Sequence, residues 1–435
     1  MKVRASREQS QVHLNYAEAP PKLAEGKVRA WLCAFLLIPM VAFGAAGGDD
    51  REGVFTGSWR GRVEAYGSSL PLIMTFAADG RCTIDSPEQG IFGVETAVSH
   101  NDGDSLKVTI PSIGATIAGR LRGDSLHATY RIMRSSFPIV FTPYDYALVR
   151  PQTPQPPYPY ATEEVTFHNV SGGASLAGTL TYPADWDGVT AVPVVLMVTG
   201  SGQQNRDEEV FGHKPFLVIA DHLARHGIAS LRYDDRGYGA STGDAAVATT
   251  ADFAADAAAG VDYLRSRGLF STVGIIGHSE GGTIAFMLGQ QGKADFIISM
   301  AGMAVRGDSV LLEQNRQQTG ADAITIEEVH DAVAALHNPW LNFFATYSPA
   351  QAIECTTCPV LALAGERDTQ VDPLTNSLSI QRHLPKNPHS AIIIYPGLNH
   401  LFQNCRTGSI AEYMSIEQTI ATEVLDDITA WIRGL

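Results

Sequence analysis

The stretch "VGIIGHSEGGTIAFM", residues 273–287, decides how the rest of the chain is interpreted. It begins as an apolar run, passes through a Gly-rich turn around Ser279, and continues with the apolar spacing of a helix. Gly277 and Gly281 stand two positions on either side of Ser279, in the pattern G-x-S-x-G. A sharp turn from strand to helix needs small neighbours and can present one hydroxyl. The stretch therefore predicts a nucleophilic serine, with a structural Gly-Ser turn as the alternative.

Buried strands that alternate with helices surround this turn. Apolar, strand-like runs that lead into glycine-containing loops occupy residues 192–200, 228–237, 272–279, 295–302, 358–365 and 390–397, and helical patterns occupy residues 215–227 and 249–268. This alternation predicts an α/β domain: a mostly parallel sheet with helices on both faces, over residues 162–435. The loops at the carboxyl ends of parallel strands lie at one edge of the sheet, so catalytic residues are expected there.

The N-terminal third of the chain has a different pattern. Residues 53–149 carry short, partly alternating strands separated by turns such as Asp79-Gly80 and Gly123-Asp124. This pattern predicts a small antiparallel β domain, a barrel or sandwich, over residues 50–150. Five prolines follow within "PQTPQPPYPY", residues 151–160, so residues 151–161 are expected to form an extended linker.

The first residues resemble a targeting segment. Lys27 and Arg29 precede the apolar run "AWLCAFLLIPMVAFGAAG", residues 30–47, which ends in small residues. We expect residues 1–45 to be a signal peptide cleaved near Ala45 or Ala46, with an uncleaved membrane anchor as the alternative. The mature protein is then expected to be secreted or periplasmic, without stable membrane insertion.

Charge and cysteine content restrict the partners. The net charge of −15 argues against nucleic acid, because a phosphate-binding surface needs excess Lys and Arg. Export would make a disulfide possible among Cys82, Cys355, Cys358 and Cys405, and the sequence does not choose among their three complete pairings. The pair in "CTTC" lacks a second ligand pair at zinc-site spacing, so we expect no metal site and no cofactor. The oligomeric state is not predicted.

A serine hydroxyl is a weak nucleophile without a base, and the base should follow late in the chain. "YPGLNHLF", residues 395–402, places His400 on the loop after a strand. The acid should lie between Ser279 and His400, and Asp368 follows another strand end in "CPVLALAGERDTQV", residues 358–371. Glu366 and Asp372 remain alternatives for the acid, whose task is to orient the imidazole.

Two backbone N–H groups should stabilise the developing oxyanion. The residue after the nucleophile supplies one, so Glu280 is the first candidate, and it opens a helix whose dipole favours negative charge. The second should come from "TGSGQQNRDE", residues 199–208. Ser201 is preferred there, with Gly202 and Gln203 as alternatives.

The segment at about residues 303–354 is expected to form a short helical lid. Trp340, Phe343 and Phe344 have roughly helical spacing within it. They either form the core of the lid or line an acyl pocket, to which Gln203 would also contribute.

Taken together, residues 50–435 resemble the α/β-hydrolase superfamily, and more closely secreted bacterial serine carboxylesterases with a β-rich N-terminal domain. The resemblance rests on "TGSGQQNRDE", "LRYDDRGYGAST", "GHSEGG", "PVLALAGERDTQV" and "LNHLFQ". The sequence departs from many relatives by Thr199-Gly200 in place of His-Gly, and by a short lid.

The resemblance implies hydrolysis of carboxylic esters with short to medium acyl groups through an acyl-enzyme. A serine exopeptidase on the same fold is the nearest alternative. A non-catalytic protein that binds glycan or cell envelope through its β domain is an alternative of another class.

Overall fold

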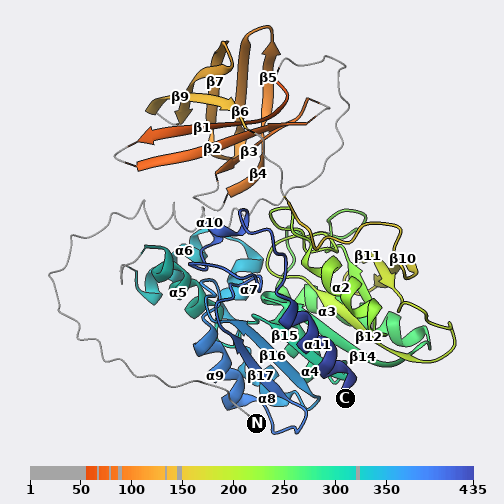
Figure 1. Ribbon diagram of the computed structural model, residues 1–435. Coiled ribbons are helices and arrows are strands. Elements are labelled where there is room, and N and C mark those ends of the chain that lie inside the picture. The colour runs from red at the N-terminus through yellow and green to blue at the C-terminus, as the bar shows by residue number, and fades with distance from the viewer. Residues whose placement is uncertain are drawn as a thin grey trace. The chain divides into compact units, whose positions relative to one another are not determined.

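The computed structural model describes residues 55–65, 68–77, 80–86, 91–132, 135–144, 149–319 and 324–435. The targeting segment predicted at residues 1–45 lies outside these residues. Within them, no helix is long and apolar enough to cross a membrane. The described chain divides into two compact units (Figure 1). Of the described residues, 55–149 and Tyr413–Ser415 form one unit, and Arg150–Glu412 with Ile416–Leu435 form the other.

The N-terminal unit is built on one antiparallel sheet with the strand order β4-β3-β2-β1-β9-β8-β7-β6-β5. Its strands are β1 (Gly57–Ala65), β2 (Ser68–Phe76), β3 (Cys82–Ser86), β4 (Ile91–Glu95), β5 (Ala97–Asp102), β6 (Ser105–Ile110), β7 (Ala115–Arg122), β8 (Ser125–Ile132) and β9 (Ser135–Pro143), with the short 3-10 helix η2 (Pro111–Ile113) between β6 and β7. Alternate residues of β6, namely Leu106, Val108 and Ile110, are buried in its core. This period of two is what a sheet with one buried face requires, and the predicted antiparallel β domain is confirmed.

The C-terminal unit contains an eight-stranded mixed sheet with the order β10-β11-β13-β12-β14-β15-β16-β17. Its strands are β10 (Thr162–Asn169), β11 (Ala174–Thr181), β12 (Val192–Val198), β13 (Ala229–Tyr233), β14 (Phe270–His278), β15 (Phe296–Met300), β16 (Val360–Gly365) and β17 (Ala391–Tyr395). Strand β11 pairs antiparallel with β10 and β13, and all later pairs are parallel. The carboxyl ends of β14, β16 and β17 therefore lie at the same edge.

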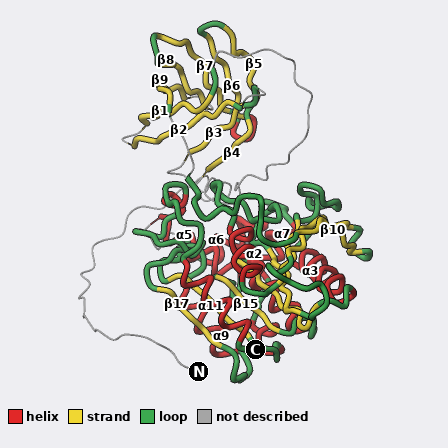
Figure 2. Tube along the Cα trace, turned by 45° about the vertical axis from the view of Figure 1, so that its right-hand side comes forward, coloured by secondary structure: helices red, strands yellow, loops and turns green. Residues whose placement is uncertain are grey.

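Helices cover both faces of this sheet (Figure 2). They are α2 (Pro215–Arg225), α3 (Thr250–Ser266), α4 (Glu280–Gln290), α5 (Gly307–Thr319), α6 (Ile326–Ala335), α7 (Pro339–Thr346), α8 (Ala350–Cys355), α9 (Pro373–His383), α10 (Ile410–Tyr413) and α11 (Thr422–Arg433). Helices α5 to α8 occupy the segment predicted as a lid, between β15 and β16. The predicted fold class, an α/β sheet flanked by helices and preceded by a β domain, is confirmed.

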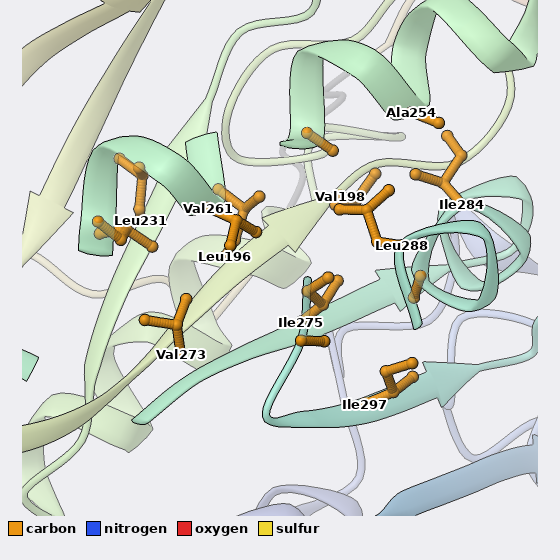
Figure 3. Close-up of a cluster of buried hydrophobic side chains, with 14 of the residues drawn as sticks. Leu196, Val198, Leu231, Ala254, Val261, Val273, Ile275, Ile284, Leu288 and Ile297 are labelled. Carbon is orange, nitrogen blue, oxygen red and sulfur yellow. The ribbon is translucent and has the colours of Figure 1, made fainter. Parts of the chain in front are cut away.

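The strands of the sheet contribute side chains to two hydrophobic cores. Leu196 and Ile275 point into one core, which α3 and α4 complete (Figure 3). The next residues along each strand, Met197 and Ile276, point into the other core, beneath α2 and α11. Both faces of each central strand are therefore buried, which explains the unbroken apolar runs of the sequence.

The proline-rich segment after Arg150 packs on the C-terminal unit. Gln152 Nε2 donates to the carbonyl of Ile420 at 2.8 Å, and the hydroxyl of Tyr160 donates to Asp221 at 2.9 Å. This segment, expected as a linker, is thus held by side-chain hydrogen bonds that composition does not reveal. None of the possible disulfides among Cys82, Cys355, Cys358 and Cys405 is formed, since all four are free thiols.

Candidate active site

Ser279 occupies a strained turn between β14 and α4. Its backbone has φ 53° and ψ −117°, a region that residues with a side chain rarely adopt. The Ser279 N–H donates to the carbonyl of Met300 at 2.9 Å, and its own carbonyl accepts the Gly282 N–H at 3.0 Å. These bonds tie the turn to the end of β15, so the strain is held by the surrounding structure.

The glycines around Ser279 are required by the space available. A Cβ at Gly277 would lie 2.0 Å from the carbonyl oxygen of Gly281, and one at Gly281 would lie 2.1 Å from that of Val198. Both contacts are with backbone, which cannot rotate away. The G-x-S-x-G pattern is therefore a steric condition for a turn that presents Ser279.

Asp368 and His400 meet at the same sheet edge. His400 Nδ1 lies 2.7 Å from Asp368 Oδ2, and both side chains are buried. Asp368 Oδ1 accepts the backbone N–H groups of Gln370 and Val371 at 2.8 and 2.9 Å. A carboxylate fixed in this way orients the imidazole and leaves its Nε2 for a proton-transfer partner.

The loop of His400 is also fixed beside the turn of Ser279. His278 Nε2 donates to the carbonyl of His400 at 3.0 Å, and the two imidazole centroids are 4.7 Å apart. No hydrogen bond between described residues joins the Ser279 hydroxyl to the His400 ring. Such contacts often tighten only when substrate binds. The structure thus places His400 next to the residue that precedes Ser279.

The two alternative acids have other partners. Glu366 Oε2 accepts the Gly397 N–H at 3.0 Å, which braces the loop after β17. Asp372 caps the N-terminus of α9 by accepting the Thr375 N–H at 2.7 Å. Neither is hydrogen-bonded to the histidine among the described residues, so geometry favours Asp368 as the orienting acid.

The loop after β12 passes close to the turn of Ser279. A Cβ at Gly200 would lie 3.2 Å from Ser279 Cβ. The Gly200 N–H is already used, because it donates to Glu208 Oε1 at 2.9 Å. The N–H of Ser201 has no hydrogen-bond partner among the described residues and remains the candidate donor. The side chain of Gln203 donates to the carbonyl of Arg236 at 2.8 Å, which braces the loop rather than a substrate.

Glu280 begins α4, and its carboxylate is buried beneath the lid. It accepts the Thr250 hydroxyl at 2.6 Å and the indole N–H of Trp340 at 2.9 Å. The hydroxyl of Ser201 also acts on this carboxylate. Burial raises the pKa of Glu280, although these donors act in the opposite direction. The side chain of Glu280 therefore links the first turns of α3 and α7 to the loop after β12, while its backbone N–H stays at the helix N-terminus.

The predicted pocket residues on α7 separate into two pairs. The ring of Trp340 lies 5.3 Å from that of Phe344, which is buried in the lid. Phe343 is half-buried and stacks on Tyr347 at 5.4 Å. Phe344 thus belongs to the lid core, whereas Trp340 and Phe343 are half-buried and keep surface for an acyl chain.

Glu208 and His278 were not assigned a role from the sequence. Glu208 is buried with φ 53° and lies eight residues after Gly200, so only the folded loop brings it to His278. Glu208 could have been identified from the sequence by one signal: it is a carboxylate in the Gly-rich loop that also carries a predicted oxyanion donor.

Known proteins match the C-terminal unit. A family model described as serine aminopeptidase, S33, matches residues 214–319, which include the turn of Ser279. Esterase EstD of Thermotoga maritima is 27% identical over 273 residues, or 59% of this chain and 65% of the esterase. The match thus leaves about a third of that relative uncovered.

The C-terminal unit resembles the α/β-hydrolase superfamily and has its fold. The strand order and the strained serine turn agree with this assignment. Solved structures that the chain resembles include an esterase from Pyrococcus furiosus, at 16% identity and a TM-score of 0.45, covering 67% of this chain and 99% of that one. Est1E from Butyrivibrio proteoclasticus, solved with ferulic acid bound, aligns at 16% identity and a TM-score of 0.43, covering 62% and 98%.

Proposed function

We propose that this α/β-hydrolase is a serine carboxylesterase that cleaves esters of short to medium acyl groups. Ser279 attacks the ester carbonyl, and His400 Nε2 accepts its proton and returns it to the leaving alcohol. Water then hydrolyses the acyl-enzyme by the same route. The observation that carries the proposal is the hydrogen-bonded pair Asp368–His400 beside the turn of Ser279.

The oxyanion of each tetrahedral intermediate would bind the backbone N–H groups of Glu280 and Ser201. Both residues follow strand ends at the same edge of the sheet. Glu280 is also the first residue of α4, so the helix dipole stabilises negative charge there. Losing one such donor typically costs about 10²–10³-fold in rate. No metal or other cofactor is needed for these steps.

A serine exopeptidase is the second candidate, because the matching family model is described as serine aminopeptidase. An exopeptidase must bind a charged chain end. The carboxylate nearest Ser279 in sequence, that of Glu280, is buried and already accepts donors from Thr250 and Trp340. This saturation favours the ester substrate.

The test is a substrate panel with wild type and Ser279→Ala. Wild type should hydrolyse p-nitrophenyl esters, with a maximum among acetate to octanoate, and Ser279→Ala should lose turnover while its melting temperature stays near that of wild type. Turnover of aminoacyl or dipeptidyl anilides above that of esters would favour the exopeptidase. Full activity of Ser279→Ala would reject both.

We also propose that the protein acts outside the cytoplasm, on the basis of the apolar run at residues 30–47. The remaining alternative is that the β domain binds glycan. Binding of the full chain to members of a glycan panel would support this alternative.

A further inference from the structure

His278 stands between Gly277 and Ser279, and both of its ring nitrogens contact acceptors. Nδ1 lies 2.9 Å from Glu208 Oε1, and Nε2 lies 3.0 Å from the carbonyl oxygen of His400. The His278 and Glu208 side chains are 8% and 4% exposed, so water does not replace these partners.

A neutral imidazole carries one N–H and can satisfy only one of these acceptors. The carbonyl of His400 can only accept. Glu208 Oε1 also acts as an acceptor, because the Gly200 N–H donates to it at 2.9 Å. Only a ring protonated on both nitrogens donates to both partners.

We infer that His278 is a positioning residue, held as an imidazolium by Glu208, that fixes the predicted oxyanion loop and the loop of His400 on either side of Ser279. Through Glu208 it is tied to Gly200, one residue before the candidate donor N–H. Through the His400 carbonyl it is tied to the base. The inference rests on the proposed function, since it assigns a task within that site.

The electrostatics of the pair agree with this geometry. Burial disfavours the charged ring most, but Glu208, the His400 carbonyl and Asp368 together hold the pKa of His278 above its ordinary value. Asp368 acts in the same direction from the loop after β16. The buried Asp235 side chain, on the loop after β13, also interacts electrostatically with Glu208.

The imidazolium ring also lies beside the base. Its centroid is 4.7 Å from that of His400, and Asp368 holds His400 by its hydrogen bond to Nδ1. Loss of the His278 charge therefore changes the electric field at the base, which a pH profile of serine labelling can detect.

The first test is direct and does not depend on turnover. In a pH titration of protein with ¹⁵N-labelled histidine, one ring should keep both nitrogens protonated to a higher pH than ordinary imidazoles, whose pKa is about 6.5. This signal should disappear in His278→Gln and in Glu208→Gln. Absence of such a ring in the wild type, or its persistence in His278→Gln, would overturn the assignment.

The second test measures the nucleophile. The rate at which a fluorophosphonate labels Ser279 should fall about tenfold or more in His278→Gln and Glu208→Gln. The acid limb of its pH profile should move upward by about one pH unit, because a neighbouring positive charge is lost. A variant that is only less folded would show a smaller labelled fraction with the acid limb unchanged.

The matched control is His383→Gln. His383 contacts Glu354 at 2.6 Å between α9 and α8, away from the serine turn, so neither rate nor profile should change. If the wild type is not labelled at all, the proposed function fails. If the wild type and both variants are labelled alike with the same acid limb, the inference fails and the function stands.

Discussion

Replacing Asp368 by Asn tests the orientation of the base most sharply. In the structure, Asp368 Oδ2 accepts the Nδ1–H of His400, while Oδ1 accepts two backbone N–H groups from Gln370 and Val371. In Asp368→Asn the amide oxygen keeps the two backbone bonds, so the NH₂ group faces His400 Nδ1. That nitrogen must then accept, and the single ring proton moves to Nε2, where it blocks proton transfer from Ser279.

The expected loss in kcat is about 10⁴-fold, the effect of the wrong tautomer in serine hydrolases of this type. At about 1.36 kcal/mol per tenfold, this corresponds to about 5.5 kcal/mol of transition-state stabilisation. Folding should change little, because the backbone donors stay paired. Asp368→Ala should in addition lower the free energy of unfolding by about 2–6 kcal/mol, since it leaves two buried N–H groups unpaired at about 1–3 kcal/mol each.

The assay is hydrolysis of p-nitrophenyl butyrate, with urea unfolding of the same samples. Glu366→Gln and Asp372→Asn are matched controls, because each keeps its backbone acceptor and neither side chain is hydrogen-bonded to His400 among the described residues. Both should stay within about threefold of wild type. If Asp368→Asn keeps kcat within tenfold while one of the controls loses activity, the assignment of the acid is wrong.

Three further predictions concern stability. Gly281→Ala should lower the free energy of unfolding by about 3 kcal/mol or more, because its Cβ would lie 2.1 Å from a backbone oxygen. Trp340→Phe should lower it by about 1.5–3 kcal/mol, since the buried carboxylate after the nucleophile loses a donor. His278→Gln should lower the melting temperature most below pH ~6.5 and progressively less at higher pH, because a raised folded-state pKa stabilises only while the ring is protonated.

Each of these has a control that separates the specific contact from a general effect. Gly292 has φ 66° with open space around its Cα, so Gly292→Ala should cost only about 1–2 kcal/mol of left-handed strain. The Trp431 indole donates to an exposed carbonyl, and Trp431→Phe should cost less than about 1 kcal/mol. Urea unfolding should separate Gly281→Ala from Gly292→Ala, and Trp340→Phe from Trp431→Phe; equal losses of unfolding free energy within a pair would contradict the predicted contact. A change in melting temperature that is the same at every pH in His278→Gln would contradict the predicted role of its charge.

The sequence by itself determined the strands and helices of the C-terminal unit and the turn at Ser279. Strand runs, their glycine ends and the pattern around Ser279 are local, so each follows from residues within one turn or strand. The candidates Ser279, Asp368 and His400 follow from the residue order of hydrolase triads together with their places at strand ends, which a parallel sheet gathers at one edge. That is why the fold class and the candidate residues could be predicted without coordinates.

Only the tertiary structure decided which acid contacts His400, what holds the proline-rich segment, and where Glu208 lies. His278 reaches Glu208 across 70 positions and the His400 carbonyl across 122. Contacts over such separations depend on how loops pack, not on the propensities of neighbouring residues. The strained turn of Ser279 and the buried charge beside it exist because the whole sheet edge closes around them.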